Sequence, residues 1–419
     1  MLLLLQASSC RNPSCTLPPE LLALVLARLD PAERLGSMAR VCSAWRTAAV
    51  IASNSISARG RVCWGRAGPE PSGFTQDKAT ALSGWLQAHA AAAALDSLEV
   101  TVSHTHSHRC PQRDFPTIQL PVQQLASLRS LDLERIKVDI QGAADTQAAP
   151  AVLPPELSGL TSLRLWRAEL GLSTLPAFTN LQHLALELGN SSFDLSGLLL
   201  LTHLHLSHDC ADDAVLASVS SLTCLQELHL GVGCYTDSGL AALPPCITKL
   251  VVGGDVTLAP NSTPAVAQLT ALQWLEVNCA AGFSTAVLRS MSSLRHLDVQ
   301  HTPLLAAAGD GDNGDIDLAV LNGLTQLQHL ELPIEPLADE AAVGPEADVA
   351  ALTASSQLTY LNIERLVAHQ HYRKMFAEGR QLPKLKELHA TMGVLGTADN
   401  AQALVRCCPN LERLEVSAG

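Results

Sequence analysis

Apolar residues recur along most of this chain in one short pattern. It reads leucine or isoleucine, two variable residues, leucine, one variable residue, and then Leu, Val, Ile or Ala. Thirteen copies begin at Leu95, Leu128, Leu160, Leu181, Leu201, Leu225, Ile247, Leu272, Leu294, Leu327, Leu358, Leu385 and Leu411, at steps of 20 to 33 residues. Each copy, a hexad, predicts a short strand whose fourth and sixth residues point inward, while the third, fifth and seventh face solvent.

A repeat of this length is typical of a leucine-rich-repeat solenoid, in which each repeat contributes one strand to a concave sheet. One repeat cannot bury its own leucines, so neighbouring repeats must stack. We therefore predict an α/β fold, a curved solenoid of about thirteen repeats with a parallel concave sheet, over residues 95–419. The longer steps predict protruding loops or extra helical turns near residues 101–127, 141–153, 300–326 and 333–357.

The segment 15–50 does not follow the repeat and predicts three short helices. Pro18 and Pro19 open the first helix, and Asp30 caps the second. The segment carries, in order, Leu17-Pro18, Glu20-Leu21-Leu22, Leu29-Asp30-Pro31 and Val41-Cys42-Ser43-Ala44-Trp45-Arg46. These motifs resemble the F-box, a three-helix element that docks on a Skp-type adaptor of a cullin–RING ubiquitin ligase. A generic cap on the solenoid is the alternative, although a cap needs a polar outer face.

The resemblance implies which side chains would bind the adaptor. They are Leu17, Pro18, Leu21, Leu22, Val25, Leu26, Leu29, Val41, Cys42 and Trp45. Residues 1–14 are expected to be a disordered N-terminus, and residues 51–94 a connector. The connector begins with a Gly- and Pro-rich stretch and continues into a predicted helix over Asp77–Ala94, which we expect to cap the first repeat.

Composition narrows the classes of partner and the compartment. The net charge of −13 argues against general binding of nucleic acid and against docking on anionic membranes. Twelve cysteines without a CxxC pair are expected to be reduced and mostly buried. The apolar run Met1–Leu5 is too short for a signal peptide, and no long uncharged apolar run predicts a transmembrane helix. We expect a cytoplasmic or nuclear protein, or one present in both compartments.

The concave positions are acidic and rich in histidine, with two tryptophans and a tyrosine. Exposed Trp and Tyr are common anchors of protein interfaces, although both tryptophans can instead pack on neighbouring strands. We predict that a target protein contacts Arg164, Trp166, His183, His203, His205, His229, Trp274, Glu276, Asp298 and Tyr360. The negative charge favours a target segment that carries Lys or Arg.

Candidate chemistry is sparse. His183, His203, His205 and His229 fall on three consecutive predicted strands, which would allow a metal site or a pH-sensitive patch, but no short metal-ligand spacing accompanies them. An Asp-rich stretch over 310–317 resembles the middle of an EF-hand loop, but Gly309, Gly311 and Val320 stand where the loop needs carboxylate ligands. Without a nucleophile, phosphate-loop or zinc motif, we expect no catalytic residue, no metal and no cofactor.

The two modules together resemble the F-box/leucine-rich-repeat proteins, substrate receptors of SCF-type ubiquitin ligases. The resemblance implies that the F-box binds the adaptor while the solenoid holds a target, with the chain monomeric within the complex. A second hypothesis is a scaffold whose F-box no longer engages the adaptor. A third is a sensor of an anionic small molecule, which the widely spaced concave cations Arg164, Lys249 and Arg413 disfavour.

Overall fold

A computed structural model describes much of the chain in two compact units, which divide between residues 193 and 194 and are treated separately below. The described residues are 55–62, 64–65, 68–69, 76–93, 95–104, 115–140, 152–168, 170–187, 193–207, 213–231, 237–254, 268–279, 283–300, 304–305, 318–332, 349–363, 372–391 and 398–417. The predicted F-box segment and its adaptor-binding residues lie outside these ranges.

The first unit is built on a parallel sheet. Its order is β1 (Ser55–Val62), β4 (Ser97–His104), β6 (Ser130–Glu134), β8 (Ser162–Trp166) and β9 (His183–Glu187). A parallel pair, β5 (Thr117–Leu120) with β7 (Lys137–Ile140), and an antiparallel pair, β2 (Trp64–Gly65) with β3 (Gly68–Pro69), stand apart from it. The described residues of the unit also form helix α5 (Gln76–Ala93) and the 3-10 turns η4 (Val122–Gln124), η5 (Pro155–Leu157) and η6 (Leu175–Ala177).

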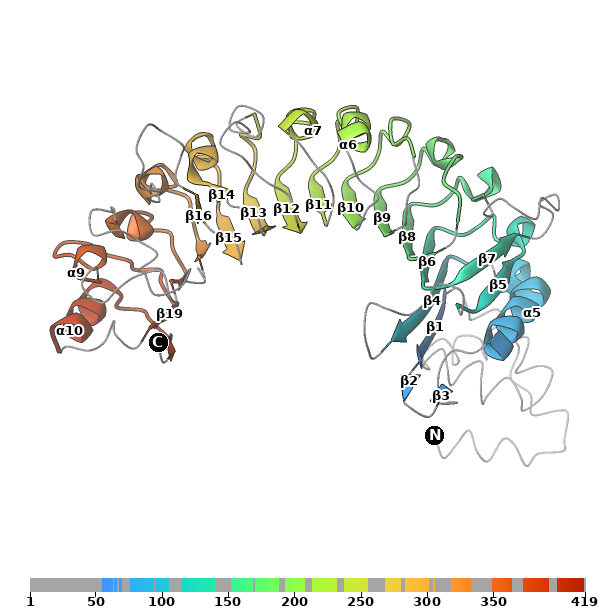
Figure 1. Ribbon diagram of the computed structural model, residues 1–419, viewed down its shortest axis with the longest axis horizontal. Coiled ribbons are helices and arrows are strands. Elements are labelled where there is room, and N and C mark those ends of the chain that lie inside the picture. Colours follow the sequence, from blue (N-terminus) through green and yellow to red (C-terminus); the bar gives the residue numbers. More distant parts are fainter. Residues whose placement is uncertain are drawn as a thin grey trace, which may run out of the picture. The chain divides into compact units, whose positions relative to one another are not determined.

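The second unit repeats one strand and one connecting segment. Its parallel strands are, in order, β10 (His203–Ser207), β11 (Glu227–Leu230), β12 (Lys249–Gly254), β13 (Trp274–Cys279), β15 (His296–Gln300), β17 (His329–Glu331), β18 (Tyr360–Asn362), β19 (Glu387–Thr391) and β20 (Arg413–Ser417). The connecting segments contain α6 (Asp213–Val219), α7 (Asp237–Ala241), β14 (Phe283–Ser284), η8 (Thr285–Ser290), β16 (Leu304–Leu305), η9 (Leu318–Gly323), η10 (Val349–Thr353), α9 (Tyr372–Met375) and α10 (Ala398–Cys407). Within the unit, the strands line one face and the helices lie behind them (Figure 1).

The repeat register predicted from the hexads is confirmed. Each of the thirteen hexads forms a strand that begins at its third residue. Paired strands align hexad on hexad, as in Leu275 opposite Leu297 and Leu297 opposite Leu330. The fourth-position leucine is at most 2% exposed in twelve strands and 37% exposed only at Leu414 of β20. The stacked leucines therefore form the core, as the period-two alternation requires.

A backbone contact fixes the start of each strand that follows β10 in the second unit. The carbonyl of the second hexad residue accepts hydrogen bonds from the N–H groups of both the second and third residues of the next repeat. Thr248 accepts from Gln273 and Trp274, and Gln273 accepts from Arg295 and His296, at 2.8 to 3.0 Å. Because two bonds hold each junction, the side chains at these positions emerge at fixed intervals along the sheet.

Two expectations for the connector are refined. The helix predicted over Asp77–Ala94 is present as α5, with bounds shifted by one residue, and its role as a cap stays a prediction. However, Ser55–Val62 forms β1, paired residue for residue with β4, so the parallel sheet begins within the segment interpreted as a connector. The sequence signal of this strand is a period-two alternation, in which apolar Ile56, Ala58 and Val62 alternate with polar Ser57 and Arg59. The prediction of a connector followed the neighbouring glycines instead of this alternation.

The cysteines partly follow the prediction. Among the described residues, Cys224, Cys246, Cys407 and Cys408 are unpaired thiols. Cys407 and Cys408 are buried, and burial raises the pKa of the Cys408 thiol to about 12. Cys224 is exposed, contrary to the expectation, because it occupies the solvent-facing turn before its hexad.

Helix α5 packs through its buried Ala79 and Leu86, and its polar side chains bond to β5. Gln76 both donates to the Thr117 carbonyl and accepts from its N–H, and the Ser83 hydroxyl accepts from the Gln119 N–H. We predict that a fragment beginning at residue 95 melts at a lower temperature than one beginning at residue 75, because it exposes the apolar side chains that α5 covers. Calorimetry of the two fragments measures this difference, and equal melting temperatures would show that α5 is not a cap.

Candidate functional site

Four aromatic side chains at the third hexad position form a continuous stack across the second unit. Trp274 lies 3.4 Å from His296, His296 4.0 Å from His329, and His329 4.1 Å from Tyr360, measured between ring centroids, with planes within 15° of parallel. Direct pairing of β13, β15, β17 and β18 produces this stack, since equivalent positions are adjacent across a parallel sheet. We call these four residues the ring ladder.

Stacking changes the electrostatics of the ladder. Burial, reinforced by the neighbouring His329, lowers the pKa of His296 to about 3, so this ring is neutral at physiological pH. Burial beside Glu331 raises the pKa of Tyr360 to about 12. The ladder is therefore an apolar ridge with polar ring edges, and Trp274 at its end is 37% exposed. The sequence left open whether this tryptophan packs laterally or faces solvent, and it does both.

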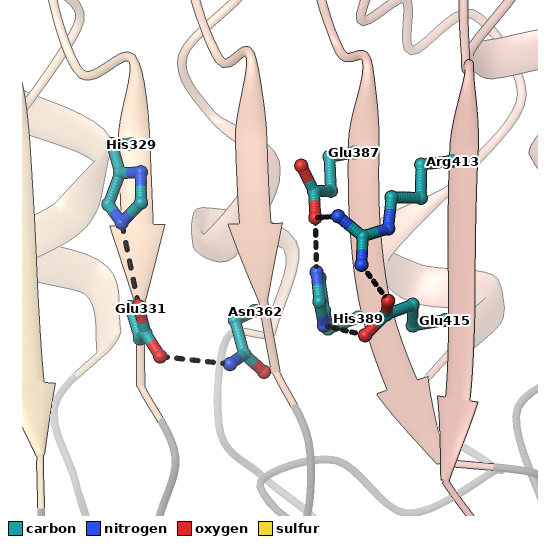
Figure 2. A network of polar contacts seen from close by, with 7 residues as sticks. All are labelled: His329, Glu331, Asn362, Glu387, His389, Arg413 and Glu415. Atoms are coloured by element: carbon teal, nitrogen blue, oxygen red, sulfur yellow. Dashed lines mark hydrogen bonds and ion pairs between the residues drawn. The ribbon is translucent and has the colours of Figure 1, made fainter.

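A row of carboxylates runs beside the ladder at the fifth hexad position. Glu276, Asp298 and Glu331 are direct neighbours on β13, β15 and β17. Figure 2 shows Glu331 between His329, at 3.6 Å, and the Asn362 amide, which donates at 3.1 Å. The contacts with His329 and then Asn362 hold the pKa of Glu331 below its usual range. We call Glu276, Asp298 and Glu331 the acidic row.

Beyond the acidic row and Asn362, a cluster of opposite charges lies on β19 and β20. His389 lies 2.7 Å from Glu387 and 3.1 Å from Glu415 through its two ring nitrogens. Arg413 contacts Glu387 at 3.1 Å and also pairs with Glu415 (Figure 2). Each carboxylate of this cluster has a cationic or imidazole partner.

A pocket of about 380 Å³ opens on the other side of the ladder. It is lined by Thr248, Lys249, Gln273, Trp274, Arg295, His296, Gln328, His329 and Thr359. These residues occupy the second and third positions of five consecutive hexads, all in the second unit. The ring ladder thus separates a row of carboxylates from a pocket that contains two permanent cations and no carboxylate.

The predicted histidine group is only partly assembled. His205 and His229 stack at 5.4 Å, and Glu227 lies 3.3 Å from His203 and 3.9 Å from His229. Burial lowers the pKa of His229. His183 is exposed in the first unit, whereas the other three belong to the second. Among the residues described, no group of three or more His, Cys, Asp or Glu side chains is arranged to hold a metal ion.

The first unit holds the two remaining predicted site residues. The Arg164 guanidinium lies 5.1 Å from the ring centre of Trp166 and 3.3 Å from the Asp132 carboxylate. Trp166 is half-buried, between Glu134 and Glu187 in the strand register. This cation–π arrangement forms a second aromatic position, separate from the ring ladder.

Several residues of the site were absent from the predicted set. His296, His329 and His389 occupy hexad positions that were predicted to face solvent, but they were not in the predicted target-binding set. Lys249 entered the sequence analysis only as one of three widely spaced cations. The row of second-position side chains was missed altogether, because alternation alone points that position inward. Its signal is in the sequence nonetheless, since the second residue is polar in all thirteen hexads.

The depressed pKa of His296 makes a prediction about acid stability. An unfolded chain protonates this histidine near pH 6.5, whereas the folded protein does so only near 3, so the unfolded state binds more protons between these values. Stability should therefore fall as pH drops from about 6.5 towards 3. Denaturant titrations should show a shallower acid loss for His296→Gln than for the wild type. Identical slopes in the two proteins would contradict this pKa.

Comparison with known proteins adds one family assignment. Residues 14–53 match the model of the F-box-like family. No curated protein matches the chain in sequence. The helices among the described residues are all too short or too polar to span a membrane.

Solved structures similar to this chain include leucine-rich-repeat proteins. An internalin (inlF) from Listeria monocytogenes shares 18% identity with a TM-score of 0.46, over 89% of this chain and 98% of the internalin. The Leptospira interrogans LRR protein LIC12759 shares 16% identity with a TM-score of 0.40, over 77% and 72% of the two chains. The TLR13–ssRNA13 complex shares 16% identity with a TM-score of 0.48, over 82% of this chain and 53% of the chain in that complex.

Proposed function

We propose that this protein, an F-box-like segment followed by a leucine-rich-repeat fold, is the substrate-recognition subunit of an SCF-type ubiquitin ligase. The observation that carries the proposal is the match of residues 14–53 to the F-box-like family, ahead of a leucine-rich-repeat fold built on parallel strands. F-box segments generally bind Skp-type adaptors, and repeat sheets generally bind proteins.

In this mechanism the chain has no catalytic residue of its own. The F-box-like segment anchors the adaptor, and the concave strands hold a target close to a ubiquitin carrier on the same ligase. Holding both reactants in one assembly raises their effective concentration, which accelerates transfer without an active site on the receptor. Such a receptor acts in the cytoplasm or nucleus, as a monomer within the complex.

The ring ladder and the acidic row support the location of the target site. Trp274 presents an exposed aromatic surface, and Glu276, Asp298 and Glu331 place negative charge beside it. A target segment with Lys or Arg fits this charge, and rim contacts of this kind weaken as salt screens them. Such a segment also supplies lysines for ubiquitin transfer.

The competing function is a protein-interaction scaffold that does not join a ligase. Affinity purification of the full chain from cells treated with proteasome and cullin-activation inhibitors separates the two. The receptor function predicts recovery of a Skp-type adaptor and a cullin together with target proteins. Recovery of target proteins with neither adaptor nor cullin would favour the scaffold.

Once a target is identified, we predict that Trp274→Ala weakens its binding about tenfold or more, because the variant removes the exposed end of the ring ladder. Trp166→Ala should also weaken binding, by a smaller factor, since Trp166 is half-buried beside Arg164. Calorimetric titration measures both affinities, and circular dichroism checks that each variant remains folded. Unchanged affinity in both variants would move the target site to the segments near residues 300–326 and 333–357.

A further inference from the structure

The pocket beside the ring ladder concentrates hydrogen-bond donors that no other residue in the described ranges uses. The guanidinium of Arg295 and the side-chain amides of Gln273 and Gln328 form no hydrogen bond or ion pair within the described part of the chain. Lys249 is shared, with its ammonium 3.6 Å from Glu227 and 5.0 Å from the Trp274 ring centre. Positive charge thus outweighs negative charge locally, in a protein whose net charge is −13.

The backbone holds these donors in place. The Gln273 carbonyl accepts from the N–H groups of Arg295 and His296, and the Arg295 carbonyl accepts from those of Gln328 and His329, at 2.8 to 3.0 Å. Thr248 and Thr359 at the two ends of the pocket donate their hydroxyls to carbonyls of the preceding repeats. Three side chains with unused donors therefore project from a backbone fixed by paired hydrogen bonds, an arrangement that is pre-organised for a ligand.

The chemistry of the pocket selects the ligand class. Arginine offers a planar fork of N–H donors that matches two oxygens of one group, and the glutamine amides add further donors. The neutral His296 ring, whose pKa is lowered to about 3, adds no charge but can donate an N–H. This donor set suits an oxyanion, such as a carboxylate or a phosphoryl group.

The pocket residues and the acidic-row residues are separated by a constant number of positions along the chain. The pocket residue Gln273, directly before β13, lies three positions ahead of the acidic-row residue Glu276, and Arg295, directly before β15, lies three positions ahead of Asp298. Three residues of extended chain span about 10 Å. An extended peptide that lies along a strand direction covers the same distance with three of its own residues.

We propose that the Arg295 pocket binds an acidic side chain of the target segment, placed three residues from a basic side chain that lies on the acidic row. This inference rests on the proposed function, because it identifies the class of target segment that the concave face receives. The ring ladder between the two charged sites packs against the intervening residues. Recognition therefore requires both signs of charge in a defined order along the target.

Synthetic peptides test this spacing with the full chain. The probes are twelve-residue peptides with three copies of Glu-Gly-Ser-Lys, the reversed sequence, and matched versions with Gln or phosphoserine in place of Glu. Of the forward and reversed Glu peptides, the one that binds more tightly should bind about tenfold more tightly than its own Gln version in calorimetric titration at low salt. Tighter binding of the phosphoserine peptide identifies a phosphoryl group as the natural oxyanion, and weaker binding identifies a carboxylate.

Receptor variants locate the effect. In Arg295→Gln the preference for Glu over Gln should shrink to less than about twofold, as a double-mutant cycle requires for directly coupled groups. The matched control Arg406→Gln, exposed on helix α10 and outside the pocket, should retain the full preference. The proposal is overturned if the wild type shows no preference, or if Arg295→Gln keeps it.

The same variant separates this inference from the proposed function. Adaptor capture depends on residues 14–53, so Arg295→Gln should co-purify with the adaptor as the wild type does. A wild type that captures the adaptor but shows no preference for the Glu peptide would remove the target-segment inference alone. A wild type that shows this preference but captures no adaptor would remove the ligase assignment alone.

Discussion

Changing Leu17 and Pro18 together to Ala is expected to abolish capture of a Skp-type adaptor. These residues lie near the start of the segment that matches the F-box-like family, and they belong to the apolar set that the resemblance implies to contact the adaptor. Removing an interface anchor of this kind costs about 2 kcal/mol or more of binding free energy, so the loss of two anchors reduces the affinity by orders of magnitude. Co-expression of the full chain with the adaptor and co-purification measures the effect.

The control for this experiment changes the same two residue types elsewhere. Leu5→Ala with Pro13→Ala lies just ahead of the matched segment and should leave adaptor capture intact. The melting temperature of the solenoid should be the same in both double variants. Full adaptor capture by the Leu17/Pro18 variant would exclude the F-box assignment for this segment.

The second large effect is expected in the leucine core. Leu275→Ala should destabilise the second unit by about 2–5 kcal/mol, because the side chain is only 1% exposed and its removal leaves a cavity between stacked repeats. Leu414→Ala, at the same hexad position on β20, should cost about 1 kcal/mol or less, since Leu414 is 37% exposed. Denaturant unfolding followed by circular dichroism compares them.

This comparison tests the stacking of the repeats as well as the burial. Strand β20 pairs only with β19 among the described strands, so its fourth-position leucine lacks the second neighbour that covers Leu275. Equal losses at the two positions would mean that the core does not depend on stacking between neighbours.

The fold was largely predictable from the sequence because one physical signal was repeated thirteen times. Each hexad places two apolar residues on the same side of a strand, and stacking of identical units leaves one register that buries all of them. The strand β1 was missed because the same signal occurs there once, without the leucine pattern and beside several glycines.

The site was predictable only in part. The hexad positions predicted to face solvent included Trp274, Tyr360 and the acidic residues, since a strand fixes which residues share a face. Which of them touch depends on distances between neighbouring side chains, and the stack of His296 on Trp274 is a property of those distances. Arg295 was missed because the second hexad position precedes the strand, where the paired hydrogen bonds rather than the alternation decide the direction of the side chain.

Direct mixing of the purified full chain with a purified Skp-type adaptor tests the central claim most directly. Size-exclusion chromatography with light scattering measures the mass of any complex, and calorimetry its affinity. The proposed function predicts one adaptor bound per chain, with a dissociation constant of about 1 μM or tighter. No complex at concentrations well above that value, from a chain whose solenoid is folded, would contradict the claim that this protein is a ligase receptor.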